Sequence, residues 1–260
     1  MIRFVVVAFV SALLLSCATS PTGQPQLQLF PEGQMAEMGQ TAYQELKQQT
    51  PVSNNPGVKR YVQCVAQSIT GVVERDTAWE VTVFDDKAAN AFALPGGKIG
   101  VYTGLLDITE NQHQLAAVIG HEIAHVQANH SNARISNAYA TQAGLTLVQL
   151  LTGATGAEKQ QLMGLLGLGA QVGVLLPYGR SQESEADTLG VNYMARAGFD
   201  PRESIALWQN MAKAGGQQPP EFLSTHPSHG SRIEQLKAHL PEALELFKQA
   251  QTQGRTPDCG

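Results

Sequence analysis

The stretch Val118-Ile119-Gly120-His121-Glu122-Ile123-Ala124-His125-Val126 decides how the rest of the chain is interpreted. Positions four apart on a helix share a face, so His121 and His125 can offer both imidazoles to one ion. Glu122 lies about 100° further round the helix, from where it can reach a metal-bound water without ligating the metal. The apolar neighbours would bury these side chains, which is costly unless a cation satisfies them. The segment predicts a helix that holds one Zn²⁺ per chain, with Glu122 as the catalytic base.

A second, acidic stretch supplies the missing ligand. A catalytic zinc ion takes three protein ligands and keeps an open position for water. In the stretch from Arg180 to Asp187, Glu183 and Asp187 share a helix face while Glu185 points elsewhere. We expect Glu183 to complete a His, His, Glu set and Asp187 to hydrogen-bond the outer nitrogen of a ligand histidine.

Each signal has an ordinary explanation when it is taken alone. An acidic helix start is usually only charge that the helix dipole favours. The His-Glu-x-x-His string arises by chance in roughly 1 chain in 100 of this His and Glu content. Both signals in one chain favour the metal site.

Composition places the chain among ordinary globular proteins. Its 260 residues suffice for one substantial core, with 43% hydrophobic and 15% charged residues. The formal net charge of -5 and the lack of any Lys-rich or Arg-rich run argue against a nucleic-acid partner, which needs a basic face.

The N-terminus resembles an export signal. A short positive start precedes the apolar run 4–15, which is too short to cross a bilayer. Leu14-Leu15-Ser16-Cys17 resembles the bacterial lipobox, so residues 1–16 are expected to be a signal peptide and Cys17 a lipidated first residue. Plain secretory cleavage, with Cys17 a bystander, is the alternative. The lipid anchor predicts attachment to a bacterial cell envelope, at the outer membrane and facing the periplasm.

The predicted export also sets the domain plan and the state of the other cysteines. Residues 17–32, which are polar and rich in Pro and Gln, are expected to be a flexible lipidated tether before one domain over residues 33–260. In an oxidising compartment Cys64 and Cys259 are expected to form a disulfide. Two unrelated thiols are the alternative, because the sequence does not show that they meet.

Periodicity predicts a mostly helical α+β fold with a small sheet. Helices are expected over 32–49, 56–73, 109–129 after a capping box at Thr109, 180–197, one capped by Asp200-Pro201, and two in the C-terminal region after a loop over 215–229. Strands are expected over 79–84, 90–94 and 98–102. The apolar stretch 138–176 resembles a membrane span, but the polar segment 152–161 interrupts it, so two buried helices are preferred.

Four motifs in consistent order resemble metallopeptidase family forty-eight, over roughly Gly33 to Leu240. They are the His-Glu-x-x-His string, the later Glu-x-x-Ala-Asp, Asn90-Ala91-Phe92-Ala93-Leu94-Pro95-Gly96-Gly97 and Thr225-His226-Pro227. The chain is most similar to the small periplasmic lipoprotein members, which act in outer-membrane quality control. The resemblance implies a zincin-like metallopeptidase domain, Glu183 as third ligand and Asp187 beside the ligands. It also implies an edge strand that binds the substrate backbone, formed by Gly97, Lys98, Ile99, Gly100 and Val101.

The expected function is zinc-dependent cleavage of peptide bonds. By resemblance, the substrates are unfolded or misfolded envelope proteins, and the outer-membrane assembly machinery is a further partner. Two other classes stay open: a chaperone or binding module with a structural zinc ion, and an adhesion or assembly lipoprotein with a decayed motif. The intact Glu122 argues against both, because a structural zinc site has no use for a base beside its ligand.

His226 has three possible roles. Pro227 restricts its backbone to an extended conformation, and the resemblance brings it near the zinc. There it can stabilise the oxyanion of the attacked carbonyl, or occupy the fourth coordination position and hold the enzyme off. It can also be a solvated loop histidine, as His229 is expected to be.

Overall fold

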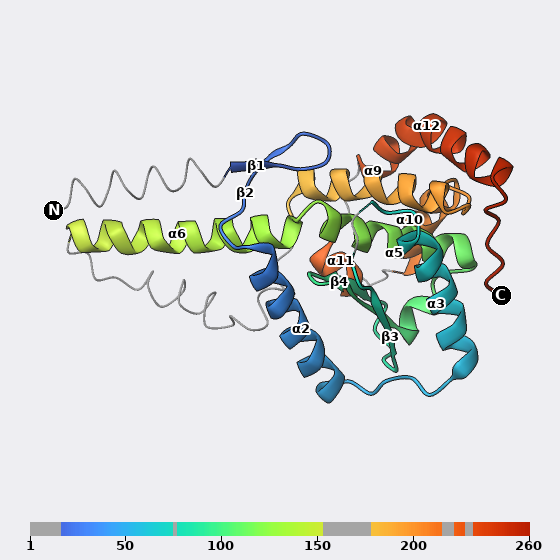
Figure 1. Ribbon diagram of the computed structural model, residues 1–260, viewed down its shortest axis with the longest axis horizontal. Coiled ribbons are helices and arrows are strands. Elements are labelled where there is room, and N and C mark those ends of the chain that lie inside the picture. The colour runs from blue at the N-terminus through green and yellow to red at the C-terminus, as the bar shows by residue number, and fades with distance from the viewer. Residues whose placement is uncertain (1–16, 75–76, 153–177, 215–220, 227–230) are drawn as a thin grey trace.

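The computed structural model describes residues 17–74, 77–152, 178–214, 221–226 and 231–260. Its helices are α2 (Glu32–Gln49), α3 (Pro56–Thr70), α4 (Thr103–Leu106), α5 (Gln112–Gln127), α6 (His130–Thr152), α9 (Arg180–Arg196), α10 (Glu203–Ala214), α11 (Glu221–Thr225) and α12 (Arg232–Thr252). Its strands are β1 (Cys17–Thr19), β2 (Pro25–Leu27), β3 (Glu80–Phe84), β4 (Ala91–Leu94) and β5 (Lys98–Tyr102). The fold is the mostly helical α+β arrangement that the sequence predicts (Figure 1).

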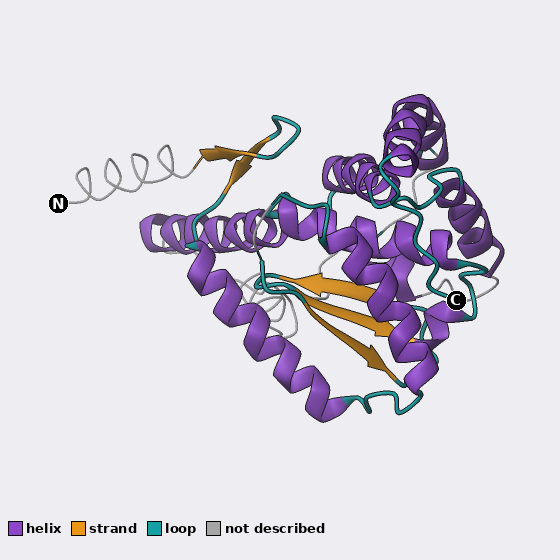
Figure 2. Ribbon diagram, turned by 45° about the vertical axis from the view of Figure 1, so that its right-hand side comes forward, coloured by secondary structure: helices purple, strands orange, loops and turns teal. Residues whose placement is uncertain are grey.

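The larger sheet has three strands in the order β3-β5-β4. β3 runs parallel to β5 and β4 antiparallel to it, so β5 is the central strand and β4 is an edge (Figure 2). Phe92 lies opposite Gly100, where a Cβ would come within 2.1 Å of the Phe92 ring. The prediction that residues 97–101 form an edge strand for substrate is therefore wrong, because neighbouring strands pair with both sides of β5.

Helix α5 lies at the centre of the fold. Every residue from Gln114 to Val126 is buried, and α3, α9, α10 and β4 all contact the helix. The side chain of Asn111 caps the helix by accepting hydrogen bonds from the backbone N–H groups of His113 and Gln114, at 2.9 and 3.0 Å. The cap expected at Thr109 is wrong by two residues.

A pair of glycines lets α9 cross α5 at close range. A Cβ at Gly120 would meet the carbonyl oxygen of Gly190 at 2.7 Å, and a Cβ at Gly190 would meet the backbone nitrogen of His121 at 2.7 Å. Without these two side chains the helix backbones touch. The crossing brings the N-terminal half of α9, with Glu183, beside the histidines of α5.

The segment expected to be a flexible tether is ordered against the rest of the chain. β1 and β2 form an antiparallel hairpin, and the residues that follow run along the junction of α5 and α6 (Figure 1). Three hydrogen bonds hold the segment there: Gln26 Nε2 to Ala128 O at 2.8 Å, Leu29 N to Ser136 Oγ at 2.8 Å, and Asn132 Nδ2 to Phe30 O at 2.7 Å. The expectation of flexibility is wrong because polar groups of α6 satisfy this backbone.

The C-terminal third differs from the prediction in two places. The short helix α11 lies inside the region expected to be a loop, and α12 runs as one helix through Pro241 where two were expected. The end of the apolar stretch, 153–177, and the predicted signal peptide, 1–16, lie outside the described residues. Among the helices that are described, none has both the length and the hydropathy to cross a bilayer.

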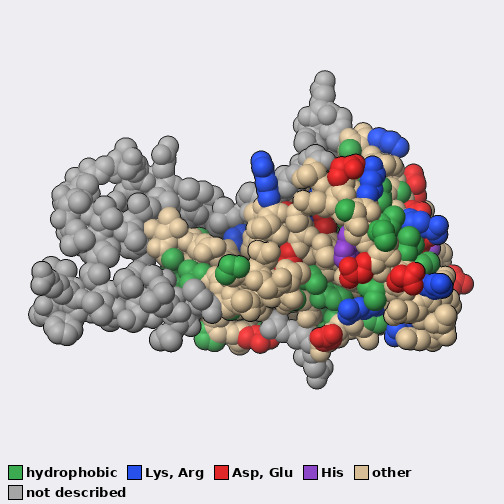
Figure 3. Space-filling model, turned by 90° about the horizontal axis from the view of Figure 1, so that it is seen from above, with side chains coloured by type: hydrophobic (Ala, Val, Ile, Leu, Met, Phe, Trp, Pro, Cys, Tyr) green, Lys and Arg blue, Asp and Glu red, His purple; other side chains and the backbone are tan. Residues whose placement is uncertain are grey.

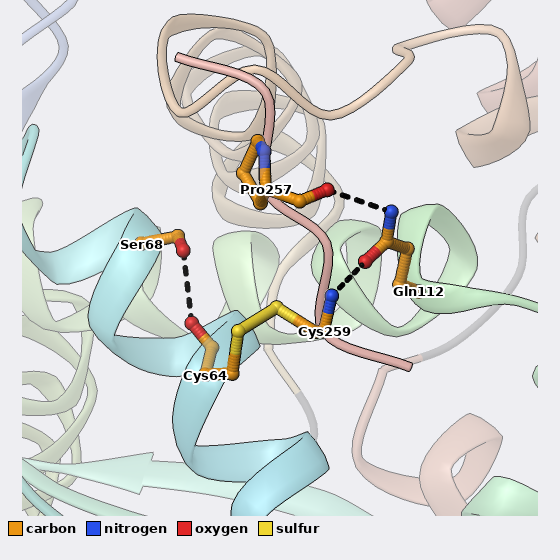
Figure 4. The surroundings of a disulfide bond; sticks show 5 residues. All are labelled: Cys64, Ser68, Gln112, Pro257 and Cys259. Atoms are coloured by element: carbon orange, nitrogen blue, oxygen red, sulfur yellow. Dashed lines mark hydrogen bonds between the residues drawn. A yellow bond between two sulfur atoms is a disulfide. The ribbon is translucent and has the colours of Figure 1, made fainter.

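The predicted disulfide forms between Cys64 of α3 and Cys259 of the C-terminal tail, with Cα atoms 5.6 Å apart (Figure 4). Next to it, Gln112 donates from Nε2 to Pro257 O at 2.9 Å and accepts from Cys259 N at 2.8 Å. The disulfide thus joins the tail to α3, and the hydrogen bonds of Gln112 hold it at the N-terminus of α5.

The surface carries charges of both signs. On the face in Figure 3, Lys and Arg side chains are interspersed with Asp and Glu over the described part of the chain, without an extended patch of one sign. This face offers no broad basic surface to a polyanion.

Candidate metal centre

Four side chains converge on the middle of α5. His121 and His125 come from α5, Glu183 from the first turn of α9, and His226 follows α11. Each offers one ligand atom, these atoms lie within 4.8 Å of one another, and all four residues are buried. The sequence predicted three of them as ligands and the fourth as a residue near the metal.

The spacing of the donor atoms fits a tetrahedral zinc ion. His121 Nε2 lies 3.0 Å from His125 Nε2 and 3.2 Å from His226 Nδ1. Glu183 Oε1 lies 3.1 Å from His226 Nδ1 and 3.4 Å from His125 Nε2. Ligands about 2.05 Å from a tetrahedral zinc ion stand roughly 3.3 Å from one another. A cation between these buried nitrogen and oxygen atoms would satisfy all of them at once.

A buried ion pair orients His121. Asp187 Oδ1 lies 3.0 Å from His121 Nδ1, so the outer nitrogen of this ligand donates to a carboxylate, as predicted. Arg232 donates from Nε and Nη2 to the two oxygens of Asp187, at 2.5 and 2.8 Å, and its Nη1 lies 2.8 Å from Glu183 Oε2. The guanidinium also lies over the ring of Trp208, 3.7 Å from its centroid.

Glu122 is placed as a base and not as a ligand. The residue is 2% exposed, and its Oε2 accepts a hydrogen bond from the backbone N–H of Ala93 in β4 at 3.3 Å. Its Oε1 has no hydrogen-bond partner among the described residues and lies 3.3 Å from His226 Nε2. The pKa of Glu122 is raised above its ordinary value, because the effect of burial outweighs the lowering by the nearby His226 and His121. This oxygen lies beside the ligand cluster, where it can accept a proton from a group bound there.

His226 is a buried part of the cluster. It is 3% exposed, its ring stacks on Phe222 with centroids 4.4 Å apart, and Tyr178 stacks on His125 at 3.8 Å. The interpretation of His226 as a solvated loop residue is therefore wrong. His229 lies outside the described residues.

The ligands differ in how readily they give up a proton. Burial lowers the pKa of His125 well below 6.5. Burial and Arg232 lower the pKa of His121, but hydrogen bonds to Asp187 and Glu183 raise it to about 9. Burial raises the pKa of Glu183, and hydrogen bonds with three histidines outweigh this and hold it far below its usual range. A bound metal requires both imidazoles to be unprotonated at the ligand nitrogen.

Sequence reasoning missed several residues of the site. Arg232, Tyr178 and His130 carry no motif that points to a metal. Glu185 was set aside because it points away from Glu183, yet it is 6% exposed and hydrogen-bonds His130. Burial raises the pKa of Glu185, but hydrogen bonds with His130 and with the N-terminal segment lower it to about 2. Lipidation of Cys17, which begins β1, stays a prediction.

Comparison with known proteins identifies the family. The model of peptidase family M48 matches residues 53–240. The chain is 36% identical to the mitochondrial metalloendopeptidase OMA1 of Schizosaccharomyces pombe over 228 residues, which cover 85% of this chain and 64% of that protein. It is 37% identical to the OMA1 of Saccharomyces cerevisiae, over 66% of this chain and 50% of that one. It is 28% identical to the beta-barrel assembly-enhancing protease of Escherichia coli, over 77% of this chain and 42% of that one. The chain therefore spans between about two fifths and two thirds of the length of these relatives.

The same relatives correct the predicted location. Six of the matching proteins, from fungi, animals and a plant, are mitochondrial metalloendopeptidases. They contradict the placement in a bacterial envelope that was inferred from the lipobox-like sequence at Cys17. The N-terminal motif was too short a signal to outweigh a likeness that extends over most of the chain.

The range that the family model matches contains all four residues of the ligand cluster. The chain belongs to peptidase family M48, and the domain that it contains is a zinc metalloendopeptidase domain with a zincin-like α+β fold.

Proposed function

We propose that this chain cuts unfolded or misfolded polypeptides, which it binds as an extra strand along the free edge of β4. One observation carries the proposal: β4 is the edge of the sheet, and the backbone N–H of Ala93 points away from β5 toward Glu122. The base and the edge strand of the described sheet therefore lie side by side.

Pairing along a strand edge selects for extended backbone and not for particular side chains. An added strand forms main-chain hydrogen bonds that every residue except proline can provide. A folded protein has few segments free to adopt this shape, whereas an unfolded one has many. We therefore expect loose sequence preference and a strong preference for unfolded substrates.

The residues divide the chemistry between them. His121, His125 and Glu183 would hold the zinc ion, which when bound lowers the pKa of a water molecule and polarises a carbonyl group. Glu122 Oε1 is free to accept the proton of the attacking water and then to deliver it to the nitrogen of the leaving amine. Asp187 keeps the Nδ1 proton of His121 in place, so that Nε2 stays available as a ligand.

His226 gives the site a resting state. With His226 Nδ1 in the cluster, four protein atoms would surround a bound zinc ion, whereas a catalytic site needs one position open for water. The other three ligands sit on α5 and α9, which pack against each other, whereas His226 follows the five-residue helix α11. His226 is therefore the ligand that can leave, and once displaced it is placed to stabilise the oxyanion.

Digestion of reduced, unfolded casein tests the proposal. Glu122→Gln should keep zinc and lose hydrolysis, because it removes the base and not a ligand. His226→Ala should raise the rate if plugging dominates, and lower it by about 10²- to 10³-fold if oxyanion stabilisation dominates. A His226→Ala variant with wild-type zinc content and rate contradicts both roles.

A binding module with a structural zinc ion is the second candidate, and the closed set of four protein ligands favours it. The two candidates differ in their need for Glu122. A structural site would leave casein intact in the wild type and in Glu122→Gln alike, whereas a peptidase would digest it only in the wild type.

A further inference from the structure

The outer nitrogen of the ligand His125 begins a line of hydrogen bonds that the proposed function does not use. His125 faces the cluster with Nε2, and its Nδ1 lies 2.9 Å from Nδ1 of His130, the first residue of α6. His130 Nε2 lies 3.2 Å from Glu185 Oε2. The other carboxylate oxygen, Glu185 Oε1, accepts from the backbone N–H and the hydroxyl of Thr22, at 3.2 and 2.7 Å.

Zinc binding fixes the direction of every proton in this line. A ligand nitrogen must be unprotonated, so His125 carries its proton on Nδ1 when Nε2 binds the metal. His130 Nδ1 must then accept, which leaves the proton of this imidazole on Nε2, aimed at Glu185. The carboxylate only accepts, from His130 on one oxygen and from Thr22 on the other. No donor meets a donor anywhere along the line.

The residues in the line are buried where it approaches the metal. His125, His130 and Glu185 are 0%, 1% and 6% exposed, so water does not replace a missing partner there. Thr22, by contrast, lies on the surface, in the turn of the β1–β2 hairpin. The line therefore connects a zinc ligand to an exposed residue that lies more than 100 positions away in the sequence.

Thr22 belongs to a segment that is fastened along its length. We call residues 22–30 the N-terminal brace, because hydrogen bonds join it to Glu185 and to the junction of α5 and α6 through Gln26, Leu29 and Phe30. Ala128, which accepts from Gln26, lies only three residues after the ligand His125. The brace thus contacts the end of the zinc helix directly and through the hydrogen-bonded line.

We propose that His130 and Glu185 are positioning residues for the zinc ligand His125, and that the docked N-terminal brace completes this support, so that zinc affinity depends on the brace being in place. The inference rests on the zinc site of the proposed function but not on its substrate. Partners that hydrogen-bond a ligand histidine fix its tautomer and ring orientation, and their loss typically weakens metal binding or activity by about 10- to 100-fold.

Zinc affinity, measured by competition with a chromophoric chelator, tests this without any peptide substrate. Glu185→Gln keeps the size of the side chain but puts a donor where two acceptors are needed, and should weaken zinc binding by roughly 10- to 100-fold. Thr22→Val removes only the hydroxyl, and should weaken it by roughly 2- to 10-fold. Thr22→Ser keeps the hydroxyl and should bind zinc within about 2-fold of the wild type. Thr41→Val makes the same change at an exposed position of α2, where the hydroxyl donates to Glu37 O of the same helix, and it should match the wild type.

Cobalt and chemical unfolding separate positioning from loss of the fold. The visible absorption of the Co²⁺-loaded protein reports ligand geometry, and it should shift in Glu185→Gln. The unfolding midpoint of this variant, measured in chelator, shows that it is folded. Wild-type zinc affinity in folded Glu185→Gln would overturn the positioning role. Equal weakening by Thr22→Val and Thr22→Ser, or none by Thr22→Val, would overturn the role of the brace. Because Thr22 is exposed, its substitutions are expected to leave the protein folded.

Discussion

Arg232→Met tests the buried ion pair that supports the site. Arg232 is 3% exposed, it bonds both oxygens of Asp187, and its Nη1 lies 2.8 Å from Glu183. One cation therefore pairs with two buried carboxylates. Met has a similar length and fills much of the space of the Arg stem, so the change removes the charge and leaves little cavity.

The expected loss is large for a single substitution. Removing one partner of a buried ion pair costs about 3–5 kcal/mol, because the other charge stays buried and unpaired. Coulomb's law gives the same size, with about 4 kcal/mol between unit charges ~4 Å apart at an effective dielectric constant of ~20. We expect Arg232→Met to lower the free energy of unfolding by about 3–5 kcal/mol, out of the roughly 5–15 kcal/mol of a typical domain.

Urea unfolding in the presence of a chelator measures this loss without a contribution from zinc, and Trp208, which stacks on Arg232, is the fluorescent reporter. Arg202→Met is the matched control, because Arg202 is 65% exposed in its pair with Asp200 and should cost less than ~1 kcal/mol. Adding Asp187→Asn to Arg232→Met should recover part of the loss, since a neutral amide needs no cation. A loss under ~1 kcal/mol for Arg232→Met, or additivity of the two changes within ~0.5 kcal/mol, would refute the reasoning.

Three further changes test separate parts of the chain. His125→Ala or Glu183→Ala should lose most of the one zinc ion per chain, because each removes a ligand; metal analysis of the purified protein checks this, and full zinc in Glu183→Ala would contradict the ligand set. Cys64→Ser should lower the free energy of unfolding by about 2–5 kcal/mol, since the bond to Cys259 joins residues 195 apart; an unchanged denaturant midpoint in oxidised protein would count against it. Burial raises the pKa of Tyr43 from 10.0 to about 12, so the folded state keeps a proton that the unfolded chain loses. Its contribution to the free energy of unfolding is complete below about pH 10 and falls as the pH rises toward 12, and Tyr43→Phe should lack this pH dependence in unfolding curves.

Local patterns predicted the parts of the fold that short-range geometry determines. The His-Glu-x-x-His spacing placed both imidazoles on one face of α5, and Asn55 before Pro56 marked the start of α3, where its Oδ1 accepts from Gly57 N at 2.9 Å. The helix expected over residues 32–49 has the same bounds in the structure. In each of these cases the residues that decide the outcome lie within a few turns of one another.

Contacts between segments far apart in the sequence could not be predicted from any local pattern. The order β3-β5-β4 depends on which strand of the β4–β5 hairpin pairs with β3, and alternation along a strand does not indicate its neighbours. Arg232 reaches Asp187 across 45 positions, and Thr22 reaches Glu185 across 163. An arginine at a helix start and a threonine in a turn are common surface residues, so their burial or pairing against the site appears only when the chain is folded.

The acidic residues of α9 show how one helix supports both histidines of another. Glu183 faces the ligand cluster, and Asp187, one turn further, contacts His121. Glu185 lies about 200° round the helix from Glu183 and meets His130, which in turn meets His125. The ligand and both supports therefore move as one body with α9. Because the backbones of α9 and α5 touch at Gly190, a shift of this single crossing would displace all three carboxylates together, and the geometry of the zinc site depends more on this crossing than on any one ligand.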